Sequence, residues 1–395
     1  MKTKQVFVTL FTLICLGIAA GCSGQSTNQT NVEAQKNTQI SANLMPSAVL
    51  VNMYNANGLE LIGLDQAYLS TISIDNSNDL GADNVVPAGK LISENADIPL
   101  VYTTYSPEVA VMLTRDGQTQ VLRKFNSLGQ IAGSNGQEAI AYSEVAFGDY
   151  SLNSFLYVGN LNDIGFSTSV YQMQDYLKQW VLAPLFVEVA DGQPSGVWYT
   201  TSGWGVGGPG IFFPITQGLY YYDIAAGTST EYLGTDQSLQ GLSPDRTMAG
   251  SIASSSYSDH DMTVTNLVTH WTLQFPLRAA SDQGSGYATF APDNQHVAWL
   301  EVGTSPYDEY QYNFVVRVGS LSDGNIDFEI DNNAVAQTLQ NNDVTYIQPV
   351  GWLDADSLLI EAHGSDWQGA AIVRLSLSDH NLYQFSKGAF VNFIY

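Results

Sequence analysis

One stretch of the chain carries oxygen-bearing side chains at a spacing that suits a hard cation. In DNSNDLGAD, the residues Asp75, Ser77, Asp79 and Asp83 stand mostly on alternate positions. Oxygen ligands brought round one centre are what calcium requires. However, Gly81 falls one place later than in the helix–loop–helix calcium motif, and no Glu closes the loop. A solvated Asp/Asn turn therefore explains the stretch as well, and calcium is the alternative interpretation.

No grouping of nucleophile and base is evident in the sequence. The motif G-x-S-x-G does not occur, so the nucleophile elbow of an α/β-hydrolase is not expected. The five histidines stand in strand or turn contexts and none forms H-E-x-x-H: His260, His270, His296, His363 and His380. The segment SDHD at 258–261 could chelate a metal, but a polar loop also explains it. We therefore expect no catalytic residue and no resident cofactor.

Aromatic residues gather around two loops and could contact a ligand. The glycine-rich stretch TSGWGVGGPG has no Lys and opens no helix, so it is not a phosphate loop. Trp198, Tyr199 and Trp204 lie in or beside it, and Tyr307 and Tyr310 lie in a second loop, SPYDEYQYN. Their rings could stack on a sugar or a peptide. The alternative is that they pack against their own sheets.

The N-terminus has the features of an export signal. Lys2 and Lys4 precede an apolar run at 6–21, whose 16 residues are short for a membrane span of about 20. Such a run is typical of a signal-peptide core, and the small residues at 19–21 suit a signal peptidase. Cys22 follows them at once.

The segment around Cys22 resembles the bacterial lipobox, although the third position before the Cys is usually Leu and here is Ala19. In that family the Cys thiol receives a diacylglyceryl group and becomes the first residue of the mature chain. An ordinary secretory signal, leaving Cys22 as a free thiol, is the alternative. Because Cys15 would leave with the signal, acylation gives the single remaining Cys a role. We therefore expect a lipoprotein signal peptide at 1–21 and lipid attachment at Cys22.

Residues 22–45 are rich in Ser, Gln, Asn and Thr, which predicts a flexible tether between the lipid and a folded domain at 46–395. Ser23 is not Asp, which favours the outer membrane if the organism has one and the cell membrane otherwise. The chain has 13 Lys and Arg against 38 Asp and Glu, a net charge of −25. A surface of this sign repels phosphate backbones, so nucleic-acid binding is not expected.

Repeats organise residues 46–395. Pro244-Asp245 and Pro292-Asp293 lie 48 residues apart, and each precedes polar residues and a short apolar run. Pro followed by Asp favours a tight turn before a strand. A second pattern, strand–turn–strand around Asp323-Gly324, is typical of a hairpin. The two patterns recur in seven candidate units of about 50 residues, which predicts four strands per unit and a β-propeller.

These repeats resemble the TolB-like, WD-type β-propeller repeats of bacterial exported proteins. The family motif commonly carries Gly after Pro-Asp, where this chain has Arg246 and Asn294. The resemblance implies an all-β propeller, with seven blades as the best count and six or eight as alternatives. It implies no chemistry, because propellers carry many unrelated functions. A pair of β-sandwiches is the alternative fold.

One segment departs from the repeat pattern. In SVYQMQDYLKQWVLAPLF, from Ser169, apolar residues recur at helical spacing, which predicts a helical insertion near 169–183 that Pro184 ends. It would cover the outside or one mouth of the propeller, or dock a partner.

Two functional hypotheses follow. The first is a monomeric, lipid-anchored, extracytoplasmic propeller that acts as a non-enzymatic binding or scaffold module for a protein or an envelope polymer. The second is a divergent glycan-processing enzyme that uses carboxylates at the mouth of the central channel. Asp191, Asp354 and Asp356 are candidates for that chemistry, although turn roles explain them more simply.

Overall fold

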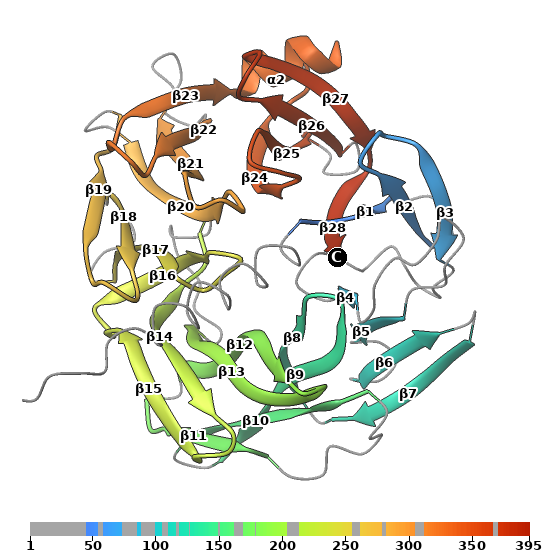
Figure 1. Cartoon of the computed structure of the whole chain (residues 1–395), viewed down its shortest axis with the longest axis vertical. Coiled ribbons are helices and arrows are strands. Elements are labelled where there is room, and N and C mark those ends of the chain that lie inside the picture. Colours follow the sequence, from blue (N-terminus) through green and yellow to red (C-terminus); the bar gives the residue numbers. More distant parts are fainter. Residues whose placement is uncertain are drawn as a thin grey trace, which may run out of the picture. The chain divides into compact units, whose positions relative to one another are not determined.

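The computed structural model describes most of the chain from residue 45 onward. The described residues are 45–53, 58–72, 85–87, 99–104, 110–115, 118–125, 127–148, 151–161, 169–177, 179–203, 213–254, 261–278, 282–304, 312–365 and 370–395. All of them belong to the compact unit Ile40–Tyr395. They form seven four-stranded antiparallel sheets placed round a ring (Figure 1). The predicted seven-bladed, all-β propeller is therefore confirmed.

The blades are numbered from the sheet that contains β1. Blade 1 has the order β28 (Ala389–Ile394), β1 (Ala48–Asn52), β2 (Leu59–Gly63), β3 (Tyr68–Ile72). Blade 2 holds β4 (Val85–Pro87), β5 (Leu100–Thr104), β6 (Ala110–Arg115), β7 (Gln118–Lys124). Blade 3 holds β8 (Leu128–Ser134), β9 (Gln137–Phe147), β10 (Leu152–Asn160), β11 (Tyr171–Asp175). Blade 4 holds β12 (Trp180–Ala190), β13 (Gln193–Gly203), β14 (Thr216–Asp223), β15 (Thr228–Leu233).

The last three blades follow in chain order. Blade 5 holds β16 (Gln237–Leu242), β17 (Met248–Ala253), β18 (Met262–Asn266), β19 (Thr272–Phe275). Blade 6 holds β20 (Asp282–Phe290), β21 (His296–Thr304), β22 (Tyr312–Ser320), β23 (Ile326–Asp331). Blade 7 holds β24 (Tyr346–Trp352), β25 (Ser357–His363), β26 (Ala371–Ser376), β27 (Asn381–Lys387).

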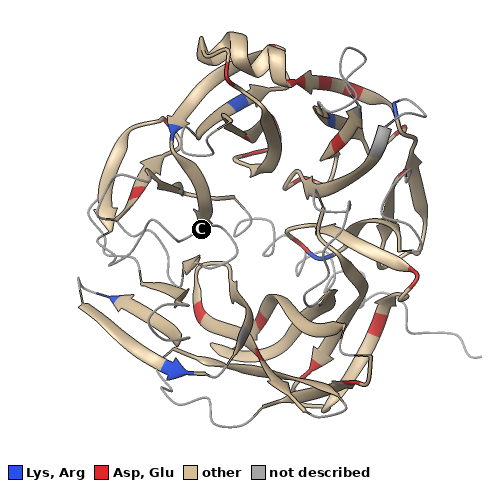
Figure 2. Cartoon of the chain, turned by 180° about the vertical axis from the view of Figure 1, so that it is seen from behind, with Lys and Arg blue, Asp and Glu red and all other residues tan. Residues whose placement is uncertain are grey.

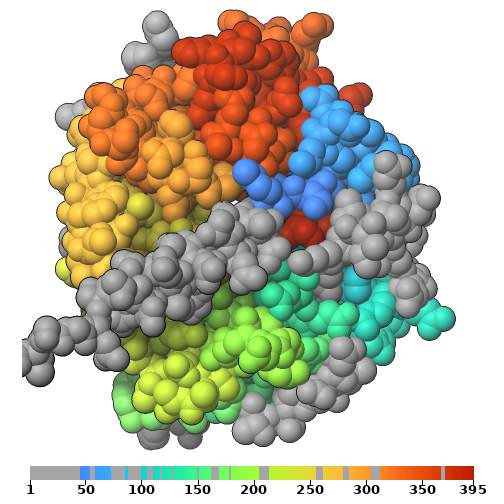
Figure 3. Space-filling view, viewed as in Figure 1, coloured from blue at the N-terminus to red at the C-terminus, as the bar shows by residue number. Residues whose placement is uncertain are grey.

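Blade 1 closes the ring, because it combines strands from both ends of the described chain. β28 pairs with β1, with Val49 opposite Phe393. Neighbouring blades touch through the inner strands β4 and β8, β8 and β12, β16 and β20, and β20 and β24, while blade 4 meets blade 5 through β14 and β16. β28 contacts both β4 and β25, which closes the ring. In the space-filling view the colours accordingly run round the ring in chain order (Figure 3).

The predicted turns form as their chemistry dictates. In the first Pro-Asp turn, Ser243 Oγ donates to Asp245 Oδ1 at 2.6 Å and the Arg246 amide donates to the Ser243 carbonyl at 2.8 Å. In the second, the Asn294 amide donates to the Ala291 carbonyl at 2.9 Å. The hairpin between β22 and β23 also forms, with Gly324 at φ 75°. Each turn delivers the chain from one strand to its antiparallel neighbour.

The core lies between the blades. Alternate side chains of each sheet face the preceding or the following blade, so each blade needs both neighbours to bury its two faces. The largest cluster joins blades 6 and 7, and includes Leu300, Val316, Ile347 and Ile360, all fully buried. This mutual dependence accounts for the blades forming one compact unit.

The predicted helix near 169–183 is wrong. Residues 171–175 form β11, the outer strand of blade 3, and 180–190 form β12, the inner strand of blade 4. Tyr171 and Met173 alternate with exposed Gln residues, which is strand periodicity, and Leu177 is 75% exposed in the turn. Pro184 lies inside β12 beside a register shift, where a missing amide is tolerated.

The helix in the described part of the chain is α2 (Asn332–Leu339), between blades 6 and 7. Asp331 caps its N-terminus by accepting from the Ala334 amide at 2.9 Å. Gln340 ends it in a left-handed conformation, and Val335 is buried. Among the described residues, no helix has the length and apolar character that crossing a bilayer requires.

Candidate functional site

The seven inner strands run in the same direction, so the turns that follow them gather at one end of the ring, called here the turn end (Figure 1). Both Pro-Asp turns lie there. Residue 395, directly after β28, lies at the same end because β28 is the inner strand of blade 1. Side chains from several blades therefore meet around the axis at this end.

Two adjoining cavities open around the axis. The first has a volume of about 290 Å³ and is lined by blades 1 to 4, including Gln130 and Ser134 of β8. The second, of about 340 Å³, extends to the turns of blades 5, 6 and 7. The two share the following lining residues: Asn135, Leu185, Phe186, Phe393 and Tyr395. They are called together the axial cavity.

Arg246 brings a positive charge to the wall of this cavity. It occupies the position after Pro-Asp with φ 59°, a left-handed conformation that favours glycine. The Asp245 carboxylate holds the turn by accepting from the Thr247 amide at 3.0 Å and the Thr247 hydroxyl at 2.8 Å. Asn294 of the second Pro-Asp turn also donates to Asp245, at 2.6 Å. The two turns are thereby tied together across blades 5 and 6.

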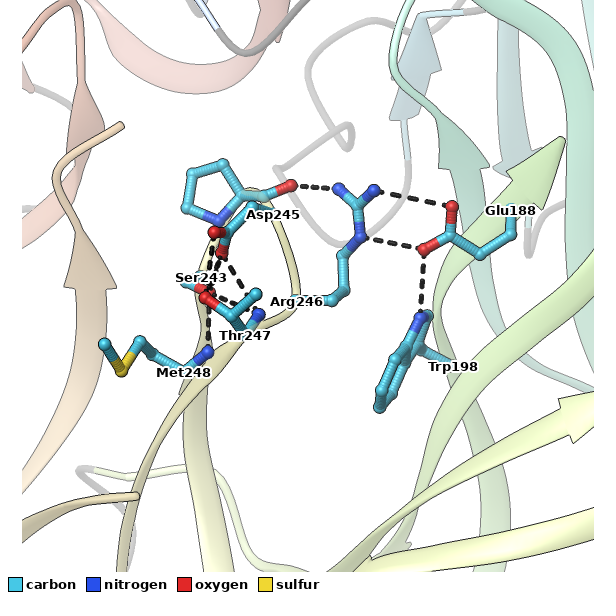
Figure 4. A network of polar contacts seen from close by, with 8 residues as sticks. Glu188, Trp198, Ser243, Asp245, Arg246, Thr247 and Met248 are labelled. Carbon is cyan, nitrogen blue, oxygen red and sulfur yellow. Dashed lines mark hydrogen bonds and ion pairs between the residues drawn. The ribbon is translucent and has the colours of Figure 1, made fainter. Parts of the chain in front are cut away.

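The Arg246 guanidinium reaches across to blade 4 (Figure 4). Its Nε donates to Glu188 Oε1 at 2.9 Å, and its Nη1 donates to the Pro244 carbonyl. It lies over the Phe186 ring, 4.1 Å from the centroid. The Trp198 indole donates to the same Glu188 oxygen at 3.0 Å. The charge of Arg246 is thus balanced by Glu188, and its guanidinium packs on the Phe186 ring at the wall of the cavity.

Tyr395 lies near this cation. Although part of the side chain is exposed to the cavity, the surrounding walls desolvate its hydroxyl. Burial raises the pKa of Tyr395 to about 12, and the nearby Arg246 partly opposes the rise. The hydroxyl therefore remains a hydrogen-bond donor at neutral pH.

The described lining offers binding chemistry: aromatic rings, amides and one guanidinium. Phe186, Phe393, Tyr395 and Trp352 bring aromatic rings to the lining, and Asn135 and Gln130 supply amide donors and acceptors. Largely apolar walls with a few fixed polar groups are typical of ligand cavities, which commonly measure 300–1,000 Å³. Each of the two parts of the axial cavity, of about 290 and 340 Å³, lies near the lower end of that range.

Two of the aromatic residues predicted to contact a ligand, Trp198 and Tyr199, are described, and both are buried in blade 4. Trp198 is 7% exposed and packs against Tyr221 and Tyr232, with ring centroids 5.2 and 4.8 Å away. Tyr199 is 3% exposed and stacks on Tyr220. Their rings take part in blade packing, and ligand contact by them stays a prediction.

Several residues predicted for a site lie outside the described residues: Cys22, Asp75, Ser77, Asp79, Asp83, Trp204, Tyr307 and Tyr310. His260, in the segment 258–261, lies outside them as well. The strands that flank the two aromatic loops are described. β13 ends at Gly203 and β21 ends at Thr304, and both are second strands of their blades. The two loops therefore leave the ring at the same end, opposite the turn end.

The candidate carboxylates lie in turns. Asp191 stands between β12 and β13 with φ 52°. Asp354 accepts from the Asp356 amide at 2.8 Å, and Asp356 accepts from the Ser376 hydroxyl at 2.9 Å. The carboxyl pKa values that shift do so downward, as at Asp175, where three backbone amides outweigh burial. Within the described ranges, no group of three or more His, Cys, Asp and Glu side chains is placed to hold a metal ion.

Acidic side chains are scattered over the blades and basic ones are few (Figure 2). Two ionic clusters are nevertheless buried. Arg317 Nη1 lies 2.7 Å from Glu301 Oε2 in blade 6. In blade 7, His363 Nε2 lies 2.9 Å from Glu361 Oε1, and Gln348 donates to Glu361 Oε2 at 3.3 Å.

No protein-family model and no curated protein sequence matches the chain. Several solved structures do match the chain. A prolyl endopeptidase structure is 9% identical with a TM-score of 0.53, and the match covers 90% of this chain and 54% of that one. TolB from Acinetobacter baumannii is 15% identical with a TM-score of 0.39, covering 72% of this chain and 62% of TolB.

An oligogalacturonate lyase in complex with manganese is 12% identical with a TM-score of 0.49, covering 87% of this chain and 85% of the lyase. The chain thus spans little more than half the length of the prolyl endopeptidase and 62% of TolB. At these identities the likeness shows the propeller fold alone. Because propellers host many unrelated functions, function has to be argued from the site.

Sequence reasoning missed the partners of Arg246. The sequence did contain one signal: Arg246 stands after Pro-Asp, where the resembling repeats commonly have glycine. An arginine there strains the backbone, which indicates that contacts of its side chain compensate for the strain. Its partner Glu188 is 58 residues away, so the contact is visible only in the folded ring.

Proposed function

We propose that the protein is a lipid-anchored, extracytoplasmic propeller that binds a protein or an envelope polymer without transforming it. The observation that carries the binding role is the axial cavity, where aromatic rings and amides from several blades line one mouth of the ring. The anchor rests on the sequence around Cys22 and on the polar tether that follows it.

The rigidity of the mouth supports binding. Asp245, Asn294 and Arg246 tie the turns of blades 5 and 6 to each other and to blade 4. Side chains held in place before the ligand arrives lose little entropy when it binds. A propeller rim with fixed turns therefore suits recognition of a partner surface.

Site-specific photo-crosslinking tests the proposal. A benzoylphenylalanine at Asn135, which lines both parts of the axial cavity, should capture a partner in the intact envelope. The matched control is the same residue at Asp323, in the exposed turn between β22 and β23. Capture at Asn135 alone is expected, with the adduct assigned as protein or glycan by mass spectrometry. Equal capture at both positions, or none at Asn135, would overturn the proposal.

A second candidate function, the glycan-processing enzyme, has one local arrangement in its favour. The Glu361–His363 contact joins a carboxylate to an imidazole, as general acid–base catalysis often does. Incubating the protein with purified envelope glycans and measuring new reducing ends or unsaturated products tests it. If the parent protein forms such products and the variant His363→Gln does not, the function is catalysis and not binding.

A further inference from the structure

Two neighbouring blades carry the same stacked pair of tyrosines on the face toward the preceding blade. In blade 3, Tyr142 lies opposite Tyr157, with centroids 5.1 Å apart and planes at 17°. In blade 4, Tyr199 lies opposite Tyr220, with centroids 5.2 Å apart and planes at 22°. In both blades the pair joins the second strand to the third, so the two sites are repeats of one arrangement.

In the first of these sites, a cation from the preceding blade covers the tyrosines. Arg123, on the outer strand β7, places its guanidinium carbon 4.3 Å from the Tyr157 centroid. It donates to the Tyr142 hydroxyl at 3.2 Å and lies 3.6 Å from Glu144 Oε2. Tyr157 donates to the same Glu144 oxygen at 3.0 Å. Two phenols and a carboxylate thus hold one guanidinium.

In the second site, a cavity of about 310 Å³ lies against the tyrosine pair. The outer strand of blade 3, β11, supplies Tyr171 where blade 2 supplies Arg123. The Tyr171 ring lies 5.6 Å from that of Tyr199 and leaves the cavity beside Tyr220 open. This cavity is called here the blade 3–4 cavity. Space that a guanidinium fills at one interface is open at the next.

The polar lining of the blade 3–4 cavity suits a cation. Glu231 on β15 lies opposite Tyr220 and is exposed at the mouth, beside Ser229. Burial first, and then the negative charge of Glu231, raise the pKa of Tyr220. Tyr220 therefore stays neutral, and the one formal charge among the lining residues is the negative charge of Glu231. The net charge of −25 adds a long-range attraction for cations.

We propose that the blade 3–4 cavity binds the guanidinium or ammonium end of a basic side chain, arginine or lysine, presented by a partner protein. The internal Arg123 site shows that a stacked tyrosine pair with a nearby carboxylate accommodates a guanidinium, although Glu144 lies on the second strand of its blade and Glu231 on the outer strand. Aromatic faces attract such cations, most strongly where water is partly excluded. The inference rests on the proposed binding function and specifies one chemical feature of the partner.

Calorimetry with short peptides tests this site on the full chain in non-ionic detergent. The probes are Gly-Arg-Gly and Gly-citrulline-Gly, which differ in charge and hardly in shape. The arginine peptide should bind about tenfold more tightly, and Glu231→Gln should remove most of that difference. Asp191→Asn is the matched control, because it removes the same charge from an exposed turn of the same blade and keeps a residue that tolerates φ 52°.

Tyr171→Arg provides a second test by supplying an internal cation as Arg123 does. It should abolish peptide binding while circular dichroism and the melting temperature show an intact ring. Equal affinity for the two peptides, no binding of either, or binding that Glu231→Gln leaves unchanged would each overturn the inference. Binding of glucosamine in place of the peptide would also overturn the inference, because the ligand would then be an amino sugar and not a protein side chain. Photo-crosslinking at Asn135 tests the proposed binding function separately, so failure of this inference can be distinguished from failure of that function.

Discussion

Replacing Arg246 by alanine and by glycine should destabilise the ring by different amounts, and glycine should be the milder change. Both substitutions remove the pairing with Glu188 and the stacking on Phe186. The two variants differ in backbone strain, because φ at this position is 59° and only glycine adopts such a conformation without strain. In an ordinary strand or helix, the order of the two variants would be reversed.

The magnitudes follow from the contacts. The Arg246 and Glu188 side chains are 12% and 29% exposed, so solvent screening reduces their ion pair to about 1–2 kcal/mol. The contact with the Phe186 ring adds about 1 kcal/mol. Arg246→Ala should therefore cost about 2–3 kcal/mol. Glycine relieves about 1–2 kcal/mol of strain in the left-handed conformation, but it destabilises the protein by about 0.4–1 kcal/mol because it gives the unfolded chain more conformational entropy. Arg246→Gly should therefore cost roughly 0.5–1 kcal/mol less than Arg246→Ala.

Urea unfolding followed by tryptophan fluorescence measures both free energies. Trp198 reports on the change, because its indole donates to Glu188. A double-mutant cycle with Glu188→Gln isolates the ion pair, and a coupling energy of about 1 kcal/mol is expected. An alanine variant as stable as the glycine variant would refute the backbone argument. A coupling energy near zero would refute the ion-pair argument.

Four further outcomes are expected. Arg317→Met should cost about 3–5 kcal/mol in urea unfolding, because Glu301, 1% exposed, would stay charged while losing its ion pair with Arg317; adding Glu301→Gln should recover most of that loss, and no recovery would contradict the reasoning. Asp175→Ala should cost about 2 kcal/mol, because the carboxylate accepts from three backbone amides; a wild-type melting temperature would contradict it. Since the pKa of Tyr395 is about 12 in the folded state and near 10 in the unfolded chain, stability should be level below about pH 10 and fall between about pH 10 and 12; Tyr395→Phe should lessen the fall in denaturant titrations at these pH values. Cys22→Ala should abolish labelling by an alkyne fatty acid and partition into the detergent phase, and an unlabelled parent chain would contradict the anchor.

The blades could be predicted from sequence because their signals are local. A Pro-Asp pair fixes a turn within four residues, and the following apolar runs alternate with polar positions over single strands. The helix prediction near 169–183 is wrong because Met173, Leu177 and Val181 fall at helical spacing although they belong to β11, a turn and β12. Within β11 the apolar residues alternate with Gln, and pairing with β10 establishes the strand.

The candidate site could not be predicted in the same way. The axial cavity depends on which side chains of several blades point toward the axis, and the Glu188–Arg246 contact spans 58 residues. The repeated tyrosine pairs are visible in the sequence only as single tyrosines in different strands. Their equivalence emerges from the register, which places Tyr199 opposite Tyr220 as it places Tyr157 opposite Tyr142.

The pairing of β1 with β28 imposes an order on maturation. A chain made or delivered from its N-terminus presents β1 long before residues 389–394 exist to cover it. During that interval β1 has a bare hydrogen-bonding edge, which is a template for joining other copies into aggregates. Helper proteins that shield unpaired strands, or rapid delivery of the remaining chain, would protect β1 until its distant partner arrives.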